Sequence, residues 1–234
     1  EDLSAFFSSF RSPWPGRVPV FKSLRACMII NKDRSMSPWP PTFSLEGNHV
    51  HVVPLSQDHA ADLTEAAADG ELHKLWYTTV PTPEGVPAEI DRRLGLRKTG
   101  SMLPFAILKS DTGQAVGMTT YMNIDATNRR VEIGSTWYRK AVQRSPMNTE
   151  CKLMLLRHAF EELDCLAVEL RTHFMNHQSR RAIERLGARL DGILRQHMIM
   201  ANGTIRDTAV YSIPHYDWPS VKAGLEWALE KPRD

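Results

Sequence analysis

The sequence has 234 residues, and its hydrophobic content of 42% is enough for the core of a globular enzyme or binding protein. The net charge of +2 excludes a global positive field of the kind that grips nucleic acid, so any anion site must be local. The cysteines are odd in number and lack C-x-x-C spacing, which argues against a disulfide framework or a cysteine zinc site and favours a reducing cytoplasm. No apolar run approaches the roughly 18 residues of a membrane span, so we expect no membrane contact.

The first 46 residues are rich in Pro, Ser, Trp and Phe and show no sustained period of 2 or 3.6. We assign residues 1–46 to an irregular N-terminal extension and residues 47–234 to a single domain. Because the chain does not begin with methionine, whereas Met28 and Met36 do occur, the authenticity of this extension stays open and it is left out of the fold prediction.

Regular patterns begin at residue 49, with a short strand over 49–54. Ser56 then caps a helix that runs through Ala67. Residues 70–99 are expected to be mostly helical, with a break at the proline-rich loop 81–87.

The second half of the chain alternates strands and helices. Turn signals at Asp111–Gly113 and Asn202–Gly203 predict two hairpins. The strands are expected over 103–109, 114–122, 129–139, 166–172, 188–200 and 204–213. The helices are expected over 146–163, 176–186 and 220–229. This order predicts an α+β fold with a mixed sheet.

A local anion site is indicated just before the helix that starts near residue 146. No acidic residue occurs between Ile133 and Thr149, while Arg139, Lys140 and Arg144 supply positive charge. Ser145 is a suitable N-cap and Pro146 a suitable first helical residue. The free amide donors would then be those of Met147, Asn148 and Thr149, at the positive end of the helix dipole. An ordinary solvated helix start is the alternative interpretation.

Two blocks in order along the chain resemble a known family. The run Val131–Tyr138, followed by Lys152–Phe160, looks like the cofactor-binding core of the GCN5-related N-acetyltransferases, the GNAT superfamily. Asn176–Ala188 and Asp207–Ser212 are similar to segments of the ribosomal-protein N-terminal acetyltransferase (RimJ/RimL-like) branch. The loop before the helix departs from the superfamily signature Gln/Arg-x-x-Gly-x-Gly/Ala, because its glycines are missing.

The resemblance implies the fold and the donor. It implies a GNAT fold whose mostly antiparallel, twisted sheet of about six or seven strands is splayed between 129–139 and 166–172, with helices on both faces. It also implies acetyl-coenzyme A (acetyl-CoA) as acetyl donor, with no metal. The pantetheine arm would lie in the splay, with Gly134 as a bulge where the strand bends.

Cofactor-binding residues follow from the same resemblance. The backbone groups facing pantetheine would be those of Trp137, Tyr138 and Arg139, and sheet packing is the alternative role of the Trp137 side chain. The pyrophosphate would meet Arg144, Ser145, Met147, Asn148 and Thr149. Asn176 would contact pantetheine, or simply cap its helix. Arg180, Arg181 or both would meet the 3′-phosphate, with a solvated surface position as the alternative.

The resemblance also implies Glu132 as general base and Ser179 as the acid that protonates the departing thiolate, with a local helix cap as the alternative role of Ser179. A carboxylate in a partly apolar cleft has a raised pKa that suits a base. The alternative for Glu132 is a strand residue that faces solvent or pairs with Arg129. His173 and His177 are alternative bases.

The resemblance implies a primary amine as acceptor, either a protein N-terminus or a small molecule. Trp76 and Tyr77 could line its pocket through stacking or cation–π contact, and buried packing is the alternative. A second functional hypothesis is a non-catalytic acyl-CoA sensor or partner-binding module with the same fold. His49 and His51 alternate on one strand without a third ligand, so no metal site is expected. A homodimer is one open alternative for the oligomeric state.

Overall fold

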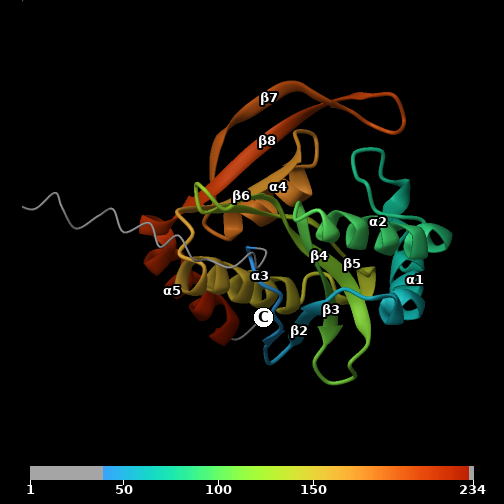
Figure 1. Cartoon of the computed structure of the whole chain (residues 1–234), viewed down its shortest axis with the longest axis horizontal. Coiled ribbons are helices and arrows are strands. Elements are labelled where there is room, and N and C mark those ends of the chain that lie inside the picture. Colours follow the sequence, from blue (N-terminus) through green and yellow to red (C-terminus); the bar gives the residue numbers. More distant parts are fainter. Residues whose placement is uncertain (1–38, 232–234) are drawn as a thin grey trace, which may run out of the picture. The chain divides into compact units, whose positions relative to one another are not determined.

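The computed structural model describes residues 39–231, and within them one sheet of eight strands has the order β1-β2-β3-β4-β5-β6-β8-β7 (Figure 1). The strands are β1 (Leu45–Glu46), β2 (Val50–Pro54), β3 (Met102–Lys109), β4 (Ala115–Asp125), β5 (Arg130–Tyr138), β6 (Ala167–His173), β7 (Arg189–Ile199) and β8 (Ile205–Pro214). Every neighbouring pair is antiparallel except β5 and β6, which are parallel. The predicted α+β fold with a mixed, mostly antiparallel sheet is confirmed.

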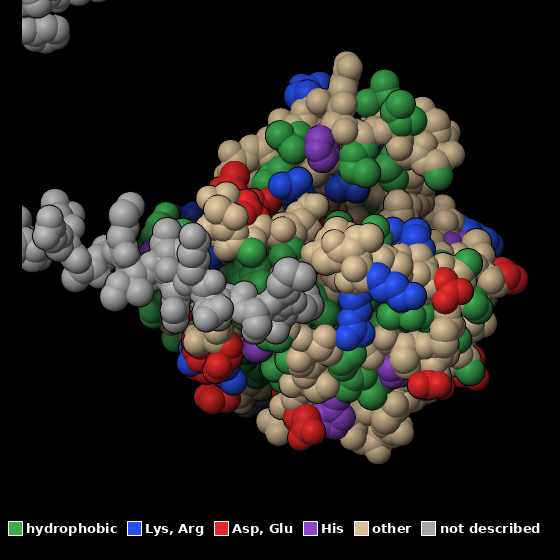
Figure 2. Space-filling view, viewed as in Figure 1, with side chains coloured by type: hydrophobic (Ala, Val, Ile, Leu, Met, Phe, Trp, Pro, Cys, Tyr) green, Lys and Arg blue, Asp and Glu red, His purple; other side chains and the backbone are tan. Residues whose placement is uncertain are grey.

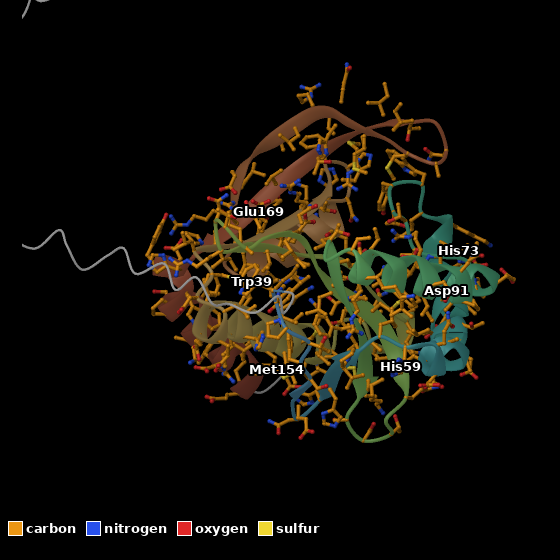
Figure 3. The ribbon with its side chains drawn as sticks, viewed as in Figure 1. Trp39, His59, His73, Asp91, Met154 and Glu169 are labelled. Carbon is orange, nitrogen blue, oxygen red and sulfur yellow. The ribbon has the colours of Figure 1, made fainter. Side chains whose placement is uncertain are left out.

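The five α-helices of the described residues are α1 (Ala60–Ala68), α2 (Val86–Lys98), α3 (Met147–Arg157), α4 (His177–Arg185) and α5 (Trp218–Glu230). Helices α3 and α5 pack on one face of the sheet over a core that includes Tyr121 and Leu155. Helices α1 and α2 pack on the other face over a smaller core that includes Leu63 and Ile90. In Figure 3, Met154 of α3 and Asp91 of α2 accordingly lie on opposite sides of the strands.

The parallel pair β5 and β6 is short. Its register joins only Arg130, Val131 and Glu132 to Ala167, Val168 and Glu169. Beyond Glu132 the two strands no longer pair, although β5 continues to Tyr138 and β6 to His173. The sheet is therefore splayed at the predicted place, and the facing edges of the two strands lack strand partners there.

A β-bulge interrupts β5 directly after Gly134. Thr120 pairs with Gly134 and Met118 pairs with Trp137, so Ser135 and Thr136 together stand opposite Thr119. Ser135 has a φ of 48°, an uncommon conformation for a residue other than glycine. Because a bulge adds a residue and bends its strand, it turns the second half of β5 away from β6.

The described part of the predicted extension contributes to the core. The ring of Phe43 packs 4.8 Å from Phe105 and 3.7 Å from His158, centroid to centroid. Leu45 and Glu46 form the edge strand β1, the strand that raises the sheet from the expected six or seven strands to eight. The remainder of the extension, residues 1–38, lies outside the described residues.

Two helical predictions differ from the structure. Between residues 70 and 99 only α2 is a full helix, and it is preceded by the single turns η2 (Leu72–Lys74) and η3 (Pro83–Gly85). The prolines in 81–87 lack the N–H groups that a continuous helix needs. The helix expected over 146–163 is α3 followed by the π-helical turn η5 (His158–Glu162). None of the helices in residues 39–231 combines the length and apolar character that a membrane crossing requires.

The hairpin of β7 and β8 extends from the body of the sheet, and hydrophobic side chains are visible on it in Figure 2. Ile199 is 81% exposed and Ile205 is 58% exposed near its turn. The turn at Asn202 and Gly203 is confirmed, since Met200 N–H bonds the Thr204 carbonyl across it. Asn202 Nδ2 also donates to the carbonyl of Trp76, 3.1 Å away, and so ties the turn to the loop before η3.

Candidate active site

Glu132 lies at the point where β5 and β6 separate, and its side chain is only 5% exposed. Asn123 Nδ2 donates a 2.6 Å hydrogen bond to Glu132 Oε2. Arg171 Nε, on β6, lies 3.4 Å from the same oxygen. Burial raises the pKa of the Glu132 carboxyl, although Asn123 and Arg171 act in the opposite direction. The direction agrees with the expectation for a general base, while the charged neighbour is Arg171 and not the expected Arg129.

Further charged side chains surround Glu132 on β6 and β8. Glu169 accepts hydrogen bonds from Arg130 and Arg171, and these bonds lower its pKa although burial alone would raise it. Figure 3 shows Glu169 beneath the β7–β8 hairpin. Arg206 is partly buried, so desolvation lowers its pKa. Glu169 is thus held as a carboxylate, while the Glu132 carboxyl is the one poised to take a proton.

The predicted anion site lies at the start of α3, one residue later than expected. Pro146 is the N-cap, and the first helical hydrogen bond runs from Glu150 N–H to its carbonyl. The Ser145 hydroxyl donates to the Val142 carbonyl at 2.6 Å and accepts from Met147 N–H at 3.4 Å. No hydrogen bond within residues 39–231 uses the N–H groups of Asn148 or Thr149. These two amides remain the donors best placed for an anion.

Arg144 precedes this helix start with an exposed side chain and a φ of 61°. A positive φ is the conformation that glycine adopts without strain. The loop thus keeps one left-handed residue, although the glycines of the superfamily signature are absent from its sequence.

Among the described residues, the backbone N–H of β5 is without a partner at Tyr138, whereas that of Arg139 is bonded. Arg139 N–H donates to the Val116 carbonyl on β4, and its guanidinium pairs with Asp69 at 3.1 Å. Since backbone groups alternate in direction along a strand, those of Trp137 also face β4, and those of Tyr138 face the splay. The Tyr138 carbonyl accepts a bond from Gln143 Nε2 there. The arrangement therefore supports the predicted backbone role for Tyr138 and not for Trp137 or Arg139.

The Trp137 side chain follows the alternative interpretation. It is buried in the smaller core beneath α1 and α2. Its indole N–H is buried without a hydrogen-bond partner.

Helix α4 carries the other predicted cofactor residues. Asn176 caps it, and its Oδ1 accepts a 3.0 Å bond from Ser179 N–H. The Ser179 hydroxyl is not part of that bond. Arg180 is occupied elsewhere, since Nε donates to the Tyr211 hydroxyl at 2.9 Å and the guanidinium lies over the Phe174 ring. This fixed position does not support a contact between Arg180 and a phosphate, whereas Arg181 is exposed.

Trp76 and Tyr77 come together at the end of β6. The ring of Trp76 lies edge-on to His173, with 5.0 Å between centroids, and Tyr77 lies 6.4 Å from the same imidazole. His173 is 4% exposed, and its Nδ1 accepts from Met175 N–H, so the neutral ring carries its proton on Nε2. Burial lowers the pKa of His173. His177, the other alternative base, is exposed at the start of α4.

Two buried charged residues of α3 are absent from the predicted site. Glu150 accepts hydrogen bonds from the backbone N–H groups of Asn48, His49 and Val50. Lys152 is 5% exposed, and its Nζ donates to the hydroxyl of Thr136 at 2.7 Å. The available signal was a lone lysine inside the apolar run that follows Cys151. Among the described residues no group of three or more His, Cys, Asp or Glu side chains is placed to hold a metal ion.

A family model described as the acetyltransferase (GNAT) domain matches residues 49–189, which is more than half of the chain. The chain belongs to the GNAT acetyltransferases. The predicted family is confirmed, and the acetyltransferase has the splayed sheet that its resemblance implies.

Individual relatives agree with this assignment. A GCN5-related N-acetyltransferase from Brucella melitensis is 32% identical, with a TM-score of 0.74 over 82% of this chain and 87% of its own. YdaF of Bacillus subtilis (strain 168), to which a ribosomal N-acetyltransferase activity is ascribed, is 32% identical over 110 residues. That match spans 47% of this chain and 59% of YdaF. RimJ of Mycobacterium smegmatis, solved in complex with CoA-disulfide, shares the fold at 22% identity and a TM-score of 0.65, over 76% of this chain and 88% of RimJ. These relatives support the RimJ/RimL-like branch.

Proposed function

We propose that this acetyltransferase transfers the acetyl group of acetyl-CoA to a primary amine by direct attack in a ternary complex. The amine belongs to a peptide N-terminus or to a small molecule. The observation that carries the proposal is the buried Glu132 carboxyl beside the gap between β5 and β6. Burial raises its pKa, and a raised pKa favours the proton uptake that a general base requires.

The acetyl donor would occupy the splay and the start of α3. The free amides of Asn148 and Thr149, at the positive end of the helix, suit its pyrophosphate. The Tyr138 N–H faces the splay and suits the pantetheine arm, which would accept from it as a strand would, while the Tyr138 carbonyl is already bonded to Gln143. The complex of RimJ with CoA-disulfide supports the choice of coenzyme A as the ligand.

The chemical step needs a neutral amine at the thioester carbon. The amine nitrogen attacks that carbon and a C–N bond forms, while Glu132 accepts the proton that the nitrogen loses, directly or through a water. The C–S bond then breaks, and the sulfur leaves as a thiolate that takes a proton from the Ser179 hydroxyl. Solvent restores that proton to Ser179 and takes up the proton that Glu132 accepted. The products are an amide and the coenzyme A thiol.

The acceptor would approach past Trp76 and Tyr77. Their rings and the His173 imidazole form an aromatic wall at the end of β6, next to the strand pair that holds Glu132. An amine that arrives as an ammonium ion is attracted to such faces before it loses its proton. The ribosomal activity ascribed to YdaF favours a peptide N-terminus, and the same wall also suits a small amine.

The test mixes the protein with acetyl-CoA and a panel of amines, both N-terminal peptides and small amines, while a thiol-reactive dye follows free coenzyme A. We expect thiol release that depends on one class of amine and is lost in Glu132→Gln. Binding of acetyl-CoA without amine-dependent thiol release would overturn the proposal. That result would favour the alternative, a non-catalytic acyl-CoA sensor.

A further inference from the structure

Lys152 is a buried cation without an anion. Its side chain is 5% exposed, and no carboxylate within residues 39–231 lies within 4.0 Å of its Nζ. Its partners are two hydroxyls, Thr136 Oγ1 at 2.7 Å and Thr119 Oγ1 at 3.4 Å. Lysine is rarely buried unless it is paired, because a desolvated ammonium is costly. We therefore expect a function that offsets the free-energy cost of burying this ammonium.

Lys152 contacts the part of β5 that lies beyond its pairing with β6. Thr136 and Thr119 form the bulge region through which β5 turns away from β6. The ammonium therefore lies against the β4–β5 bulge on the α3 face of the sheet, beyond Glu132, where β5 no longer pairs with β6.

The same side chain is aligned with the predicted anion donors. Residues three and four apart share one side of a helix, so Asn148, Thr149 and Lys152 lie along the same side of α3. Helical side chains also lean toward the N-terminus of their helix, which directs Lys152 toward the free amides. The free amides at the start of α3 and the Lys152 ammonium at the bulge therefore lie along the same side of the helix.

We propose that Lys152 is a cofactor-binding residue whose ammonium group hydrogen-bonds an oxygen of coenzyme A where the cofactor passes the Thr136 bulge. The proposal rests on the proposed function, because it requires coenzyme A in the splay. The ammonium has three donors and the protein supplies two neutral hydroxyl acceptors, so an oxygen of bound cofactor supplies the third acceptor and favours the protonated form of Lys152.

Cofactor binding is therefore linked to proton uptake. Burial lowers the pKa of Lys152 to about 8. The titratable groups nearby are Cys151 on its own helix, Tyr138 on β5 and Tyr121 on β4, and burial raises the pKa of each. The groups that bond Nζ from β4 and β5 are the two threonine hydroxyls. Because the hydrogen bond to the cofactor raises the pKa of Lys152 again, binding at pH 8.5 draws a proton from solution.

The experiment is titration calorimetry of acetyl-CoA with the full chain at pH 8.5, in buffers of different ionisation enthalpy. We expect wild type to take up about half a proton or more per cofactor relative to Lys152→Met. We also expect Lys152→Met to bind about 10- to 100-fold more weakly at pH 7, the effect of one charge-assisted hydrogen bond. Lys98→Met removes an exposed lysine at the end of α2 and controls for the lost charge; it should keep the proton uptake.

A second arm locates the contact. If adenosine 3′-phosphate 5′-diphosphate, which lacks the pantetheine arm, loses affinity in Lys152→Met as acetyl-CoA does, the acceptor is a phosphate oxygen. If only the complete cofactor loses affinity, the acceptor is an oxygen of the pantetheine arm. Equal affinity and equal proton uptake in wild type and Lys152→Met would overturn the proposal. Failure of wild type itself to bind acetyl-CoA would instead overturn the proposed function.

Discussion

Asn123 Nδ2 donates a 2.6 Å hydrogen bond to Glu132 Oε2 across the strand pair β4 and β5. Asn123 has a φ of 47°, a conformation that asparagine accepts more readily than most residues. Its amide stabilises the ionised form of a carboxylate that burial would otherwise keep protonated. The pair therefore sets the pH at which Glu132 becomes a base.

We expect Asn123→Gly to move the acidic limb of the rate profile to higher pH. Glycine removes the amide and accepts the positive φ, so the backbone is not strained. Because the lost bond lowers the pKa of Glu132, its removal raises that pKa, and activity should fall at a higher pH than in wild type. The measurement is kcat/KM against pH, with Asp164→Gly as control for glycine at an exposed residue with φ of 52°. If the acidic limb does not move, the group that titrates there is not Glu132.

Glu132→Gln should lower kcat by about 100- to 10,000-fold, the usual contribution of a general base. Glutamine preserves the volume of the side chain, and the affinity for acetyl-CoA should change little, because the carboxyl is assigned to the amine. Single-turnover thiol release together with calorimetry of cofactor binding separates the two quantities. Retention of wild-type kcat would assign the base to another residue, with His173 the next candidate.

Trp76→Ala should raise KM for the amine about tenfold while leaving cofactor affinity unchanged. The indole is 49% exposed and contacts His173 edge-on, so its removal affects the wall of the predicted acceptor site more than the core. Loss of a cation–π contact of about 1–2 kcal/mol accounts for the expected factor. Steady-state kinetics with the best amine of the panel measures KM. Trp227→Ala, at an indole 63% exposed on α5, is the matched control.

The elements that neighbouring residues specify, and the blocks that resemble the family, could be predicted from the sequence. Strand alternation, the cap at Asn176 and the turn at Gly203 are set by neighbouring residues, and each occurs in the structure. Ser56 caps only the single turn η1 (Gln57–His59), and α1 begins after it with His59 as its N-cap. Gly134 was the expected bulge, and the bulge follows it at Ser135 and Thr136. Local signals of this kind constrain position to within one or two residues.

Contacts between residues far apart in the chain could not be predicted from the sequence. The ion pair of Arg139 with Asp69 joins residues 70 positions apart, and Arg180 of α4 donates to the hydroxyl of Tyr211 on β8. Both arginines were predicted to face the cofactor, because a basic residue near a phosphate site gives no local sign of a competing carboxylate or hydroxyl. The role of Glu150, about 100 positions from its partners, was hidden for the same reason.

We expect Glu150→Gln to lower the free energy of unfolding by about 2–4 kcal/mol. The carboxylate accepts three backbone N–H bonds from residues 48–50, whereas a glutamine would turn its own NH₂ donors toward them. Urea denaturation measures the change, and Glu230→Gln on the exposed end of α5 should alter it by less than about 0.5 kcal/mol. Equal stability of both variants would mean that the hydrogen bonds between Glu150 and residues 48–50 contribute little to the free energy of unfolding.

The buried Lys152 also predicts an unusual dependence of stability on pH in the cofactor-free protein. Its pKa is about 8 in the folded chain against 10.5 for an ordinary lysine, so between these values the unfolded chain binds more protons. Stability from this group therefore rises with pH from about 8 and levels off near 10.5.

Lys152→Met, which has no charge to desolvate, should be more stable than wild type at pH 7 by up to about 3 kcal/mol, and the difference should shrink toward pH 10. Thermal unfolding of both proteins from pH 7 to 10 measures it, and a constant difference would show that Lys152 is not desolvated in the folded chain. Saturating acetyl-CoA should reduce the difference at pH 7, because only wild type gains the additional hydrogen bond and its binding free energy.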